Sequence, residues 1–209
     1  MRRLLAAALL ATAALAASCS LTRPAPVKHT YLLEAPRALE MAAPSIEGTL
    51  RVDVFGTAPA FAGKPMVYRF DEHRYDADFY NEWFVVPRDL VSQRVFEWMQ
   101  NARVYSTTLP VNGEGPRSAL VLSGLVTEMY GDLRAPSQPV AVLAIQFYIT
   151  QQGREANNVL LAQQLRQVVP VPDASAGALA DGLSTALLNI LTEFERQVRA
   201  AAPGAGEAQ

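Results

Sequence analysis

LADGLSTALLNILTEFERQV, residues 179–198, is the most regular segment of the chain. Large apolar side chains recur at the spacing of one helix face over several turns. This face consists of Leu179, Leu183, Leu187, Ile190, Leu191, Phe194 and Val198. Asp173 or Ser175 is suited to cap the start of the helix. A helix with one apolar face needs a second layer to pack on, and we expect that layer to be a sheet.

Three strand-like segments precede this helix and predict the sheet. They cover residues 119–130, 140–150 and 159–169, and Gly and Pro punctuate the links between them. This arrangement is typical of an antiparallel meander. Gly124 indicates a bulge in the first strand. The middle strand should place on one face Ala141, Leu143, Ile145, Phe147 and Ile149, and the last strand should turn toward water Gln163, Gln164, Arg166 and Gln167.

The first half of the chain predicts a second helix and further strands. Pro87 can start a helix without losing a hydrogen bond, and an apolar stripe continues to about Asn101. The stripe consists of Leu90, Val91, Val95, Trp98 and Met99. Residues 49–55 alternate, with Leu50, Val52 and Val54 on one side, and residues 103–109 are rich in β-forming residues. We therefore expect an α/β (α+β) fold, in which an antiparallel β-sheet packs against two main α-helices in a single domain.

Residues 55–84 hold nine of the chain's 17 aromatic side chains. Residues 66–70, MVYRF, predict a short strand, and the charges in residues 69–78 indicate a hairpin or loop. One interpretation is an aromatic core with a solvated charged rim, because aromatics dominate core burial. The other is a partner-binding face, because Tyr, Trp and Arg are common interface anchors. That face would be shaped by Tyr68, Arg69, Phe79, Tyr80 and Trp83.

Residues 15–20, LAASCS, indicate that the protein is exported and lipidated. Arg2 and Arg3 precede an uncharged stretch of the length of a secretory signal, which is too short for a transmembrane helix. Small residues then lead into Cys19, as in a bacterial lipobox, although Ala stands three places before it where Leu is usual. Acyl chains on Cys19 would hold the protein to a membrane. The alternative is an ordinary secreted protein in which Cys19 is a stray thiol.

Ser20 follows the cysteine, where lipoproteins retained at the inner membrane have Asp. We therefore expect a lipid anchor in the outer membrane and a body that faces the periplasm. The expected organisation is a lipoprotein signal peptide at residues 1–18, a lipidated Cys19 with an extended tether at 19–44 and a short strand near 31–34, the domain at 45–200, and a disordered tail at 201–209.

The composition of the chain argues against some classes of partner and of covalent cross-link. Without Arg2 and Arg3 the basic count falls from 18 to 16 against 20 acidic residues, which gives the mature chain a net charge of −4 and argues against nucleic acid. A single cysteine allows no intramolecular disulfide.

His73 is the one candidate metal ligand, beside Asp71, Glu72 and Asp76, but a solvated loop is favoured over a metal site. His29 lies in the expected tether. No nucleophile elbow or P-loop is present, so the sequence assigns no catalytic residue, no metal and no cofactor.

The order of elements resembles a known family, the auxiliary lipoproteins of ABC-type transport systems that are related to PqiC. The resemblance covers residues 31–198 and rests on YLLEAP at 31–36, LRVDVFGTAPAF at 50–61, MVYRF at 66–70, DFYNEW at 78–83 before Pro87, Arg103-Val104-Tyr105, and Ala178-Leu179-Ala180-Asp181. Phe84-Val85-Val86 departs from the family's usual small residues.

The resemblance implies a non-catalytic lipoprotein with two helices on an antiparallel sheet. Its partners would be an MCE-domain protein and, through it, a permease and an ATPase that move phospholipids or other hydrophobic compounds across the envelope. Relatives can assemble into rings, so the resemblance also allows a homo-oligomer. The alternative is a periplasmic lipid-binding module that carries the ligand itself, between the last helix and the sheet.

Overall fold

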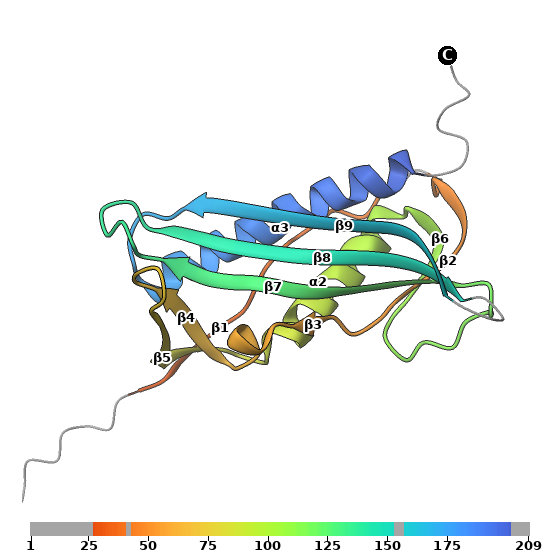
Figure 1. Cartoon of the computed structure of the whole chain (residues 1–209). Coiled ribbons are helices and arrows are strands. Elements are labelled where there is room, and N and C mark those ends of the chain that lie inside the picture. The colour runs from red at the N-terminus through yellow and green to blue at the C-terminus, as the bar shows by residue number, and fades with distance from the viewer. Residues whose placement is uncertain (1–26, 41–42, 153–156, 202–209) are drawn as a thin grey trace, which may run out of the picture.

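One curled sheet of nine strands carries both long helices on the same face (Figure 1). The computed structural model describes residues 27–40, 43–152 and 157–201. In chain order the elements are β1 (His29–Tyr31), β2 (Ile46–Val52), β3 (Gly56–Thr57), the 3-10 helix η1 (Pro59–Phe61), β4 (Pro65–Arg69), β5 (Tyr75–Trp83), α2 (Pro87–Ala102), β6 (Tyr105–Leu109), β7 (Leu120–Asp132), β8 (Val140–Gln152), β9 (Asn157–Pro170) and α3 (Ala176–Ala200). The α+β class with two main helices is confirmed.

The sheet is organised around β7. On one edge β7, β8 and β9 form the antiparallel meander that the sequence predicts. Along the other edge β2 pairs with the start of β7, β3 with its middle and β4 with its end, all in parallel. The sheet is therefore mixed and not antiparallel throughout. The reason is that the chain from β2 to β4 advances along β7 in one direction without turning back.

The remaining strands extend the sheet at opposite ends. At one end β5 pairs antiparallel with β4, and the short edge strand β1 pairs parallel with β5. At the other end β6 pairs parallel with β2. The predicted strand at residues 66–70 is confirmed as β4, and the charged residues that follow form the predicted hairpin, because the chain turns at residues 70–74 into the nine-residue strand β5. The strand expected near residues 31–34 occurs slightly earlier, at β1.

The core lies between the two helices and the sheet. Every member of the predicted apolar faces of α2 and α3 is buried, as is the predicted inner face of β8. The start of α3 is capped by Ser175, whose Oγ accepts a hydrogen bond from Ala178 N at 3.3 Å, and Asp173 in turn accepts one from Ser175 N. Pro87 is the first residue of α2, as its fixed φ favours.

β7 contains the bulge that the sequence predicts near Gly124, but Gly124 itself is not part of it. Gly124 pairs directly with Phe147, and the register shift in β7 lies between Val126 and Glu128. A Cβ on Gly124 would lie 2.3 Å from Phe55 Cε1 and 2.4 Å from the carbonyl oxygen of Gln146. The glycine is therefore required because the ring of Phe55 packs directly on the strand.

The predicted alternation of residues 49–55 ends early. Leu50 and Val52 are buried, but Val54 is 44% exposed and Phe55 is fully buried in its place. β2 ends at Val52, and Phe55 N then donates a hydrogen bond to Ser92 Oγ on α2. Once the chain leaves the strand, alternation no longer decides which side chain points inward.

β9 keeps a strict alternation, and this corrects the predicted orientation of its polar side chains. Gln164 and Arg166 are exposed, whereas Gln163 and Gln167 are half-buried on the opposite face. Residues two apart share a face of a strand and adjacent residues do not. The prediction that all four face water is therefore wrong for Gln163 and Gln167.

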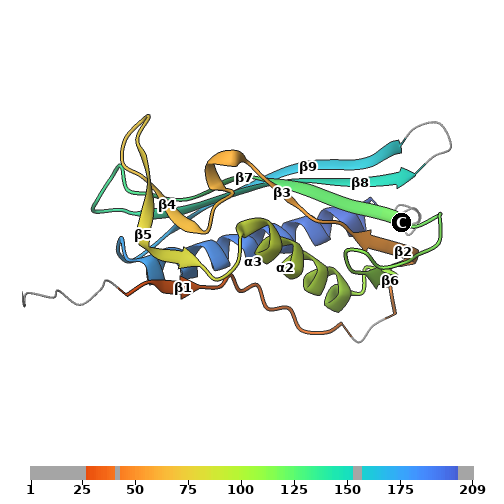
Figure 2. The same ribbon diagram turned by 90° about the horizontal axis from the view of Figure 1, so that it is seen from below.

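Much of the expected tether is packed on the body. The chain after β1 runs in an extended conformation past α3 and α2 (Figure 2). Leu33 is fully buried and Ala35 is 6% exposed. Glu34 N donates to Ser184 Oγ of α3, and Glu40 N donates to the carbonyl oxygen of Asn101 in α2. The packed body therefore starts near β1, well before residue 45.

Candidate functional site

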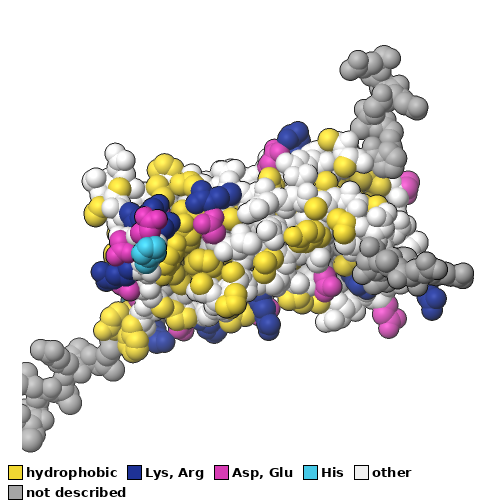
Figure 3. Space-filling view, in the orientation of Figure 1, with side chains coloured by type: hydrophobic (Ala, Val, Ile, Leu, Met, Phe, Trp, Pro, Cys, Tyr) yellow, Lys and Arg dark blue, Asp and Glu magenta, His cyan; other side chains and the backbone are white. Residues whose placement is uncertain are grey.

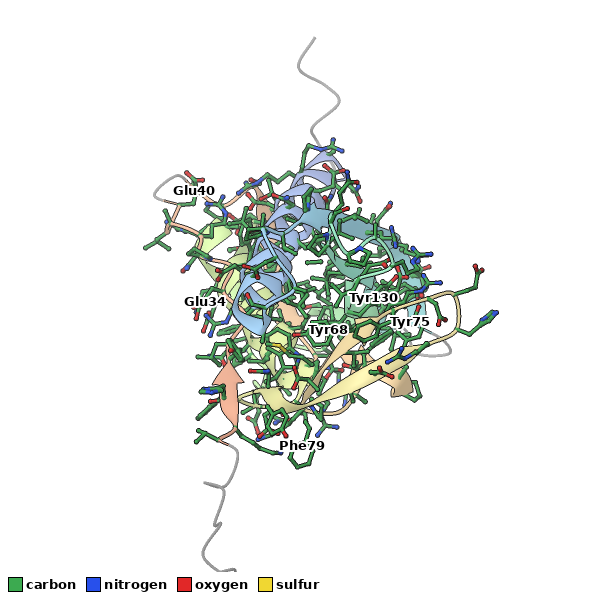
Figure 4. All side chains as sticks on the ribbon, turned by 90° about the vertical axis from the view of Figure 1, so that its left-hand side faces the viewer. Glu34, Glu40, Tyr68, Tyr75, Phe79 and Tyr130 are labelled. Carbon is green, nitrogen blue, oxygen red and sulfur yellow. The ribbon has the colours of Figure 1, made fainter. Side chains whose placement is uncertain are left out.

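The five side chains predicted to shape a partner surface do not form one surface. Trp83 and Tyr68 are buried, at 2% and 7% exposure. Phe79 and Tyr80 are 68% and 48% exposed, and Phe79 lies at the margin of the molecule beside β1 (Figure 4). Arg69 is half-buried at the end of β4. The structure thus divides the five residues between the interior and the surface.

Arg69 is occupied within its own hairpin. Its guanidinium donates to the carbonyl oxygens of Asp71 at 3.0 Å and Glu72 at 3.1 Å. It also lies 5.3 Å from the ring centre of Tyr75, which packs edge-on against Tyr130. These contacts fix the turn between β4 and β5. The role of Arg69 at the surface is therefore to hold the hairpin in position.

An open groove lies between this hairpin and the start of α3. Its volume is about 580 Å³. The groove is lined by Tyr31, Tyr68, Phe70, Asp76, Ala77, Asp78, Asn81, Leu133, Ala174, Ser175, Ala176 and Gly177. Burial, helped by the negative charge of Asp78, raises the pKa of Tyr68 to about 12. Like any tyrosine, Tyr68 is un-ionised at physiological pH, and the raised pKa reflects how deeply its ring is packed at the wall of the groove.

The polar groups of the groove are already engaged by neighbouring groups. Asp76 accepts a hydrogen bond from Arg74 Nη2 at 2.6 Å, and Ser175 caps α3. Asn81 Oδ1 accepts one from the hydroxyl of Tyr31 at 3.3 Å. None of these residues is a nucleophile paired with a base, so the groove has the character of a recognition surface with aromatic walls.

A large bulge in β5 projects the exposed aromatic pair. Pro65 pairs with Glu82 and Val67 pairs with Ala77, so the four residues from Asp78 to Asn81 lie opposite the single residue Met66. The carboxylate of Asp78 accepts hydrogen bonds from Tyr80 N at 2.8 Å and from Asn81 N at 3.0 Å. Bulges redirect side chains out of the sheet. This bulge turns Phe79 and Tyr80 outward, where their rings pack edge to face at 5.1 Å.

The sequence pattern indicated the aromatic hairpin but not the groove. Phe70, Asp76 and Asn81 belong to the hairpin, while Ser175 and Gly177 come from a segment roughly a hundred residues later. Neither segment carries a signal for the other, because the two ends meet only through the pairing of β4 with β7 and the packing of α3. In the sequence, the motif nearest to this groove is DFYNEW at residues 78–83, which is one of the motifs on which the family resemblance rests.

Neither histidine gathers other metal ligands. His29 in β1 is exposed, and His73 lies in the β4–β5 turn, where its backbone N donates to Asp71 Oδ1 at 2.9 Å. Within residues 27–40, 43–152 and 157–201, no three His, Cys, Asp or Glu side chains are grouped to hold a metal ion.

Cys19 lies outside the described residues, as do the predicted signal peptide and most of the predicted tail. The described chain starts at Val27, two residues before β1. In the described part of the chain, neither helix combines the length and the apolar character needed to cross a membrane.

Comparison with known proteins identifies the fold but not a family. No protein-family model matches the chain, and no curated protein sequence is significantly similar to it. A protein from Xanthomonas campestris, described under the family DUF330, superposes with a TM-score of 0.70 at 14% identity, covering 83% of this chain and 96% of its own. An uncharacterised protein superposes with a TM-score of 0.63 at 11% identity, covering 82% of this chain and 99% of its own. At these identities the similarity establishes that the chain shares the fold of both proteins over most of its length.

Proposed function

We propose that this protein is a lipid-anchored, periplasm-facing component of an ABC-type envelope transport system, in which it binds a partner and carries out no catalysis. The partner is an MCE-domain protein, which connects it to a permease and an ATPase that move phospholipids or other hydrophobic compounds. The fold shared with a DUF330 protein is compatible with this family resemblance.

The observation that carries the proposal is the groove between the β4–β5 hairpin and α3. Its walls include the aromatic rings of Tyr31, Tyr68 and Phe70, and its polar groups are held by internal hydrogen bonds. A pre-formed groove that combines aromatic walls with fixed polar groups suits the binding of a peptide segment. Phe70 remains 39% exposed, so it can be covered by a partner.

The anchor is tested by removing the thiol. In cells, Cys19→Ala protein should leave the outer-membrane fraction and appear in the soluble periplasmic fraction, because no acyl chain can be attached. The melting temperature of the purified Cys19→Ala protein is measured alongside, to show that the substituted protein is folded. Retention of Cys19→Ala protein in the outer membrane would rule out lipidation as the anchor.

The partner is tested by photo-crosslinking within the groove. A photoreactive phenylalanine analogue at Phe70 should capture an MCE-domain protein in intact cells. The matched control is the same analogue at Val168, which is 46% exposed on β9 and lies outside the groove. Capture of the MCE protein from both positions, or from neither, would contradict the groove as its binding site.

A second candidate function, direct lipid carriage, has one observation in its favour. A smaller and mostly apolar cavity of about 290 Å³ lies near the end of α3, lined by residues that include Leu120, Ile149, Leu161 and Val198. Elsewhere the α3 face is closed, since Leu183, Leu187 and Ile190 are 0–1% exposed. Native mass spectrometry of the purified chain decides this function, because a carrier would retain lipid and an auxiliary protein would not.

A further inference from the structure

Five large hydrophobic side chains are exposed together where the described chain begins. They are Val27 at 70%, Leu32 at 47%, Phe79 at 68%, Tyr80 at 48% and Phe84 at 59% exposure. A group of hydrophobic side chains is visible on the surface at the lower left of Figure 3. We call these five residues the aromatic face. Exposed apolar clusters on soluble proteins usually mark an interaction site.

The pairing of β1 with β5 brings these residues together from two parts of the chain. His29 pairs with Asn81 and Tyr31 pairs with Trp83, and Lys28 lies over the ring of Phe79, so the segment around β1 runs alongside the end of β5. The backbone N of Phe84 extends this pairing by donating to the carbonyl oxygen of Tyr31 at 2.8 Å. The aromatic face is therefore held by backbone hydrogen bonds and is present before any ligand binds.

Both lysines of the chain lie at this face, whereas all its other basic residues are arginines. Lys28 Nζ lies 5.5 Å from the ring centre of Phe79 and 3.1 Å from Glu82 Oε2. Lys64 Nζ donates to the carbonyl oxygen of Phe84 at 2.8 Å. Aromatic rings flanked by lysines are typical of surfaces at the boundary between lipid and water, where the ring is buried and the ammonium reaches the headgroups.

The distance to the predicted anchor is short. Val27 is eight residues further along the chain than Cys19, and a fully extended chain advances at most about 3.5 Å per residue, so the two lie at most about 28 Å apart. Acyl chains on Cys19 would thus keep the aromatic face within one bilayer thickness of the headgroups. Among the described residues, those nearest to Cys19 along the chain belong to this face.

We infer that the aromatic face lies against the lipid bilayer, with Phe79, Tyr80 and Phe84 at the level of the headgroups. This inference rests on the lipid anchor in the proposed function and adds a second membrane contact, made by the folded body. It also separates two surfaces of β5. Asn81 lines the groove, while the next residue, Glu82, pairs with Lys28 on the aromatic face, so the groove stays open to a partner.

The single cysteine allows a direct test. The mature chain from Cys19 is made without acyl groups, and its thiol is coupled to a maleimide-bearing lipid in vesicles of phosphatidylethanolamine and phosphatidylglycerol. In a Phe79→Trp variant, coupling should shift the emission of the new indole to shorter wavelength, and brominated acyl chains should quench it. The native Trp83 and Trp98 are 2% and 5% exposed and supply an unchanged background.

The matched control is Val159→Trp, which places an indole at a 54% exposed position at the far end of β9, away from β1 (Figure 1). Its emission should not change on coupling. As a second measurement, uncoupled Phe79→Ser/Tyr80→Ser/Phe84→Ser protein should bind the same vesicles at least about tenfold more weakly than unsubstituted protein, since tenfold corresponds to about 1.4 kcal/mol. Circular dichroism confirms that each variant is folded.

Two outcomes would overturn the inference. One is solvent-like emission from Phe79→Trp protein while it is coupled to vesicles. The other is a photoreactive group at residue 79 that captures only a protein in cells, which would make the aromatic face a protein interface. The thiol of Cys19 is coupled to the vesicle lipid chemically, so this experiment does not depend on lipidation in cells. A failed crosslink at Phe70 would contradict the groove as the partner site, but it would say nothing against membrane contact by the aromatic face.

Discussion

At the scale of single residues, Glu195 holds together three parts of the molecule. Its carboxylate accepts hydrogen bonds from Arg37 Nε at 2.7 Å, from Arg199 Nε at 2.9 Å and from Trp98 Nε1 at 2.9 Å. Glu195 is only 9% exposed, and a carboxylate so far from water is stable only when it is paired in this way. One charge therefore links the amino-terminal segment to α2 and α3.

Replacing this charge should destabilise the fold. In Glu195→Gln the shape is kept, but the guanidinium groups of Arg37 and Arg199 both lose the charge of Glu195, and Arg37 is left with its longer ion pair to Glu40 at 3.4 Å. We therefore expect the free energy of unfolding to fall by about 2–4 kcal/mol. Urea denaturation measures the change. Glu97→Gln is the matched control, because Glu97 pairs with Arg94 on the surface of α2 and should cost less than about 1 kcal/mol. Equal losses in the two variants would contradict the role of Glu195.

The same residue predicts a pH dependence. Burial by itself would raise the pKa of Glu195, but the hydrogen bonds from Arg37 and Arg199 outweigh it and lower the pKa below its ordinary value of 4.5. A carboxyl with a lowered folded-state pKa stabilises the protein above its unfolded-state pKa, and this stability is lost as the pH falls through the folded-state pKa. Between pH 5 and pH 3, unsubstituted protein should therefore lose stability more steeply than Glu195→Gln, as thermal unfolding would show.

Individual side chains were predictable where a regular element continues and not where it breaks. The faces of α2 and α3 follow helical spacing without interruption, and each predicted member is buried. Val54 is exposed and Phe55 is buried, against the predicted alternation, because β2 ends at Val52 and Phe55 N then donates a hydrogen bond to Ser92 in α2. The sequence around residue 54 does not indicate this contact with a distant helix. Trp83 is an equally clear case, since its burial follows from the pairing of β5 with β1, which the local sequence does not contain.

At the scale of elements, the bulge in β5 decides which aromatic residues reach the surface. The sequence predicts a charged hairpin or loop at residues 69–78, and the antiparallel pairing of β4 with β5 confirms the hairpin. It does not predict the bulge after the turn, where the carboxylate of Asp78 accepts hydrogen bonds from the backbone N of Tyr80 and of Asn81. Asp and Asn side chains commonly bond nearby backbone groups in this way, but their presence in the sequence does not reveal which strand contains a bulge.

Removing the carboxylate of Asp78 should loosen the bulge without unfolding the body. In Asp78→Ala, the amide hydrogens of Tyr80 and Asn81 lose a charged acceptor, so their exchange with solvent should accelerate by about ten- to a hundredfold. Hydrogen exchange followed by NMR measures each amide separately. Asp76→Ala is the control, because the carboxylate of Asp76 accepts a hydrogen bond from the exposed side chain of Arg74, whereas the amides of Tyr80 and Asn81 donate to Asp78. Unchanged protection of Tyr80 in Asp78→Ala would show that the bulge does not depend on this carboxylate.

At the scale of the whole molecule, the local patterns predict the layers but not the order of the strands. The meander of β7, β8 and β9 joins neighbours in the sequence, so short links reveal it. The parallel pairings of β2, β3 and β4 with β7 join segments that are some sixty to seventy residues apart, and periodicity carries no information about such pairs. The groove depends on these pairings, so it too could not be predicted from local patterns.

The packed segment before β2 provides the last test, because the sequence predicts there an extended tether with one short strand. Leu33 is buried, and Arg37 is bound by Glu195 of α3 while its carbonyl oxygen accepts a hydrogen bond from Asn101 of α2. A chain that begins at residue 45 should therefore lose about 3–5 kcal/mol and melt about 10 °C lower than a chain that begins at residue 27, since Glu195 keeps only Arg199 as a counter-charge. Differential scanning calorimetry compares the two. Equal melting temperatures would mean that the segment rests on the helices without stabilising them, and the body would then begin at β2.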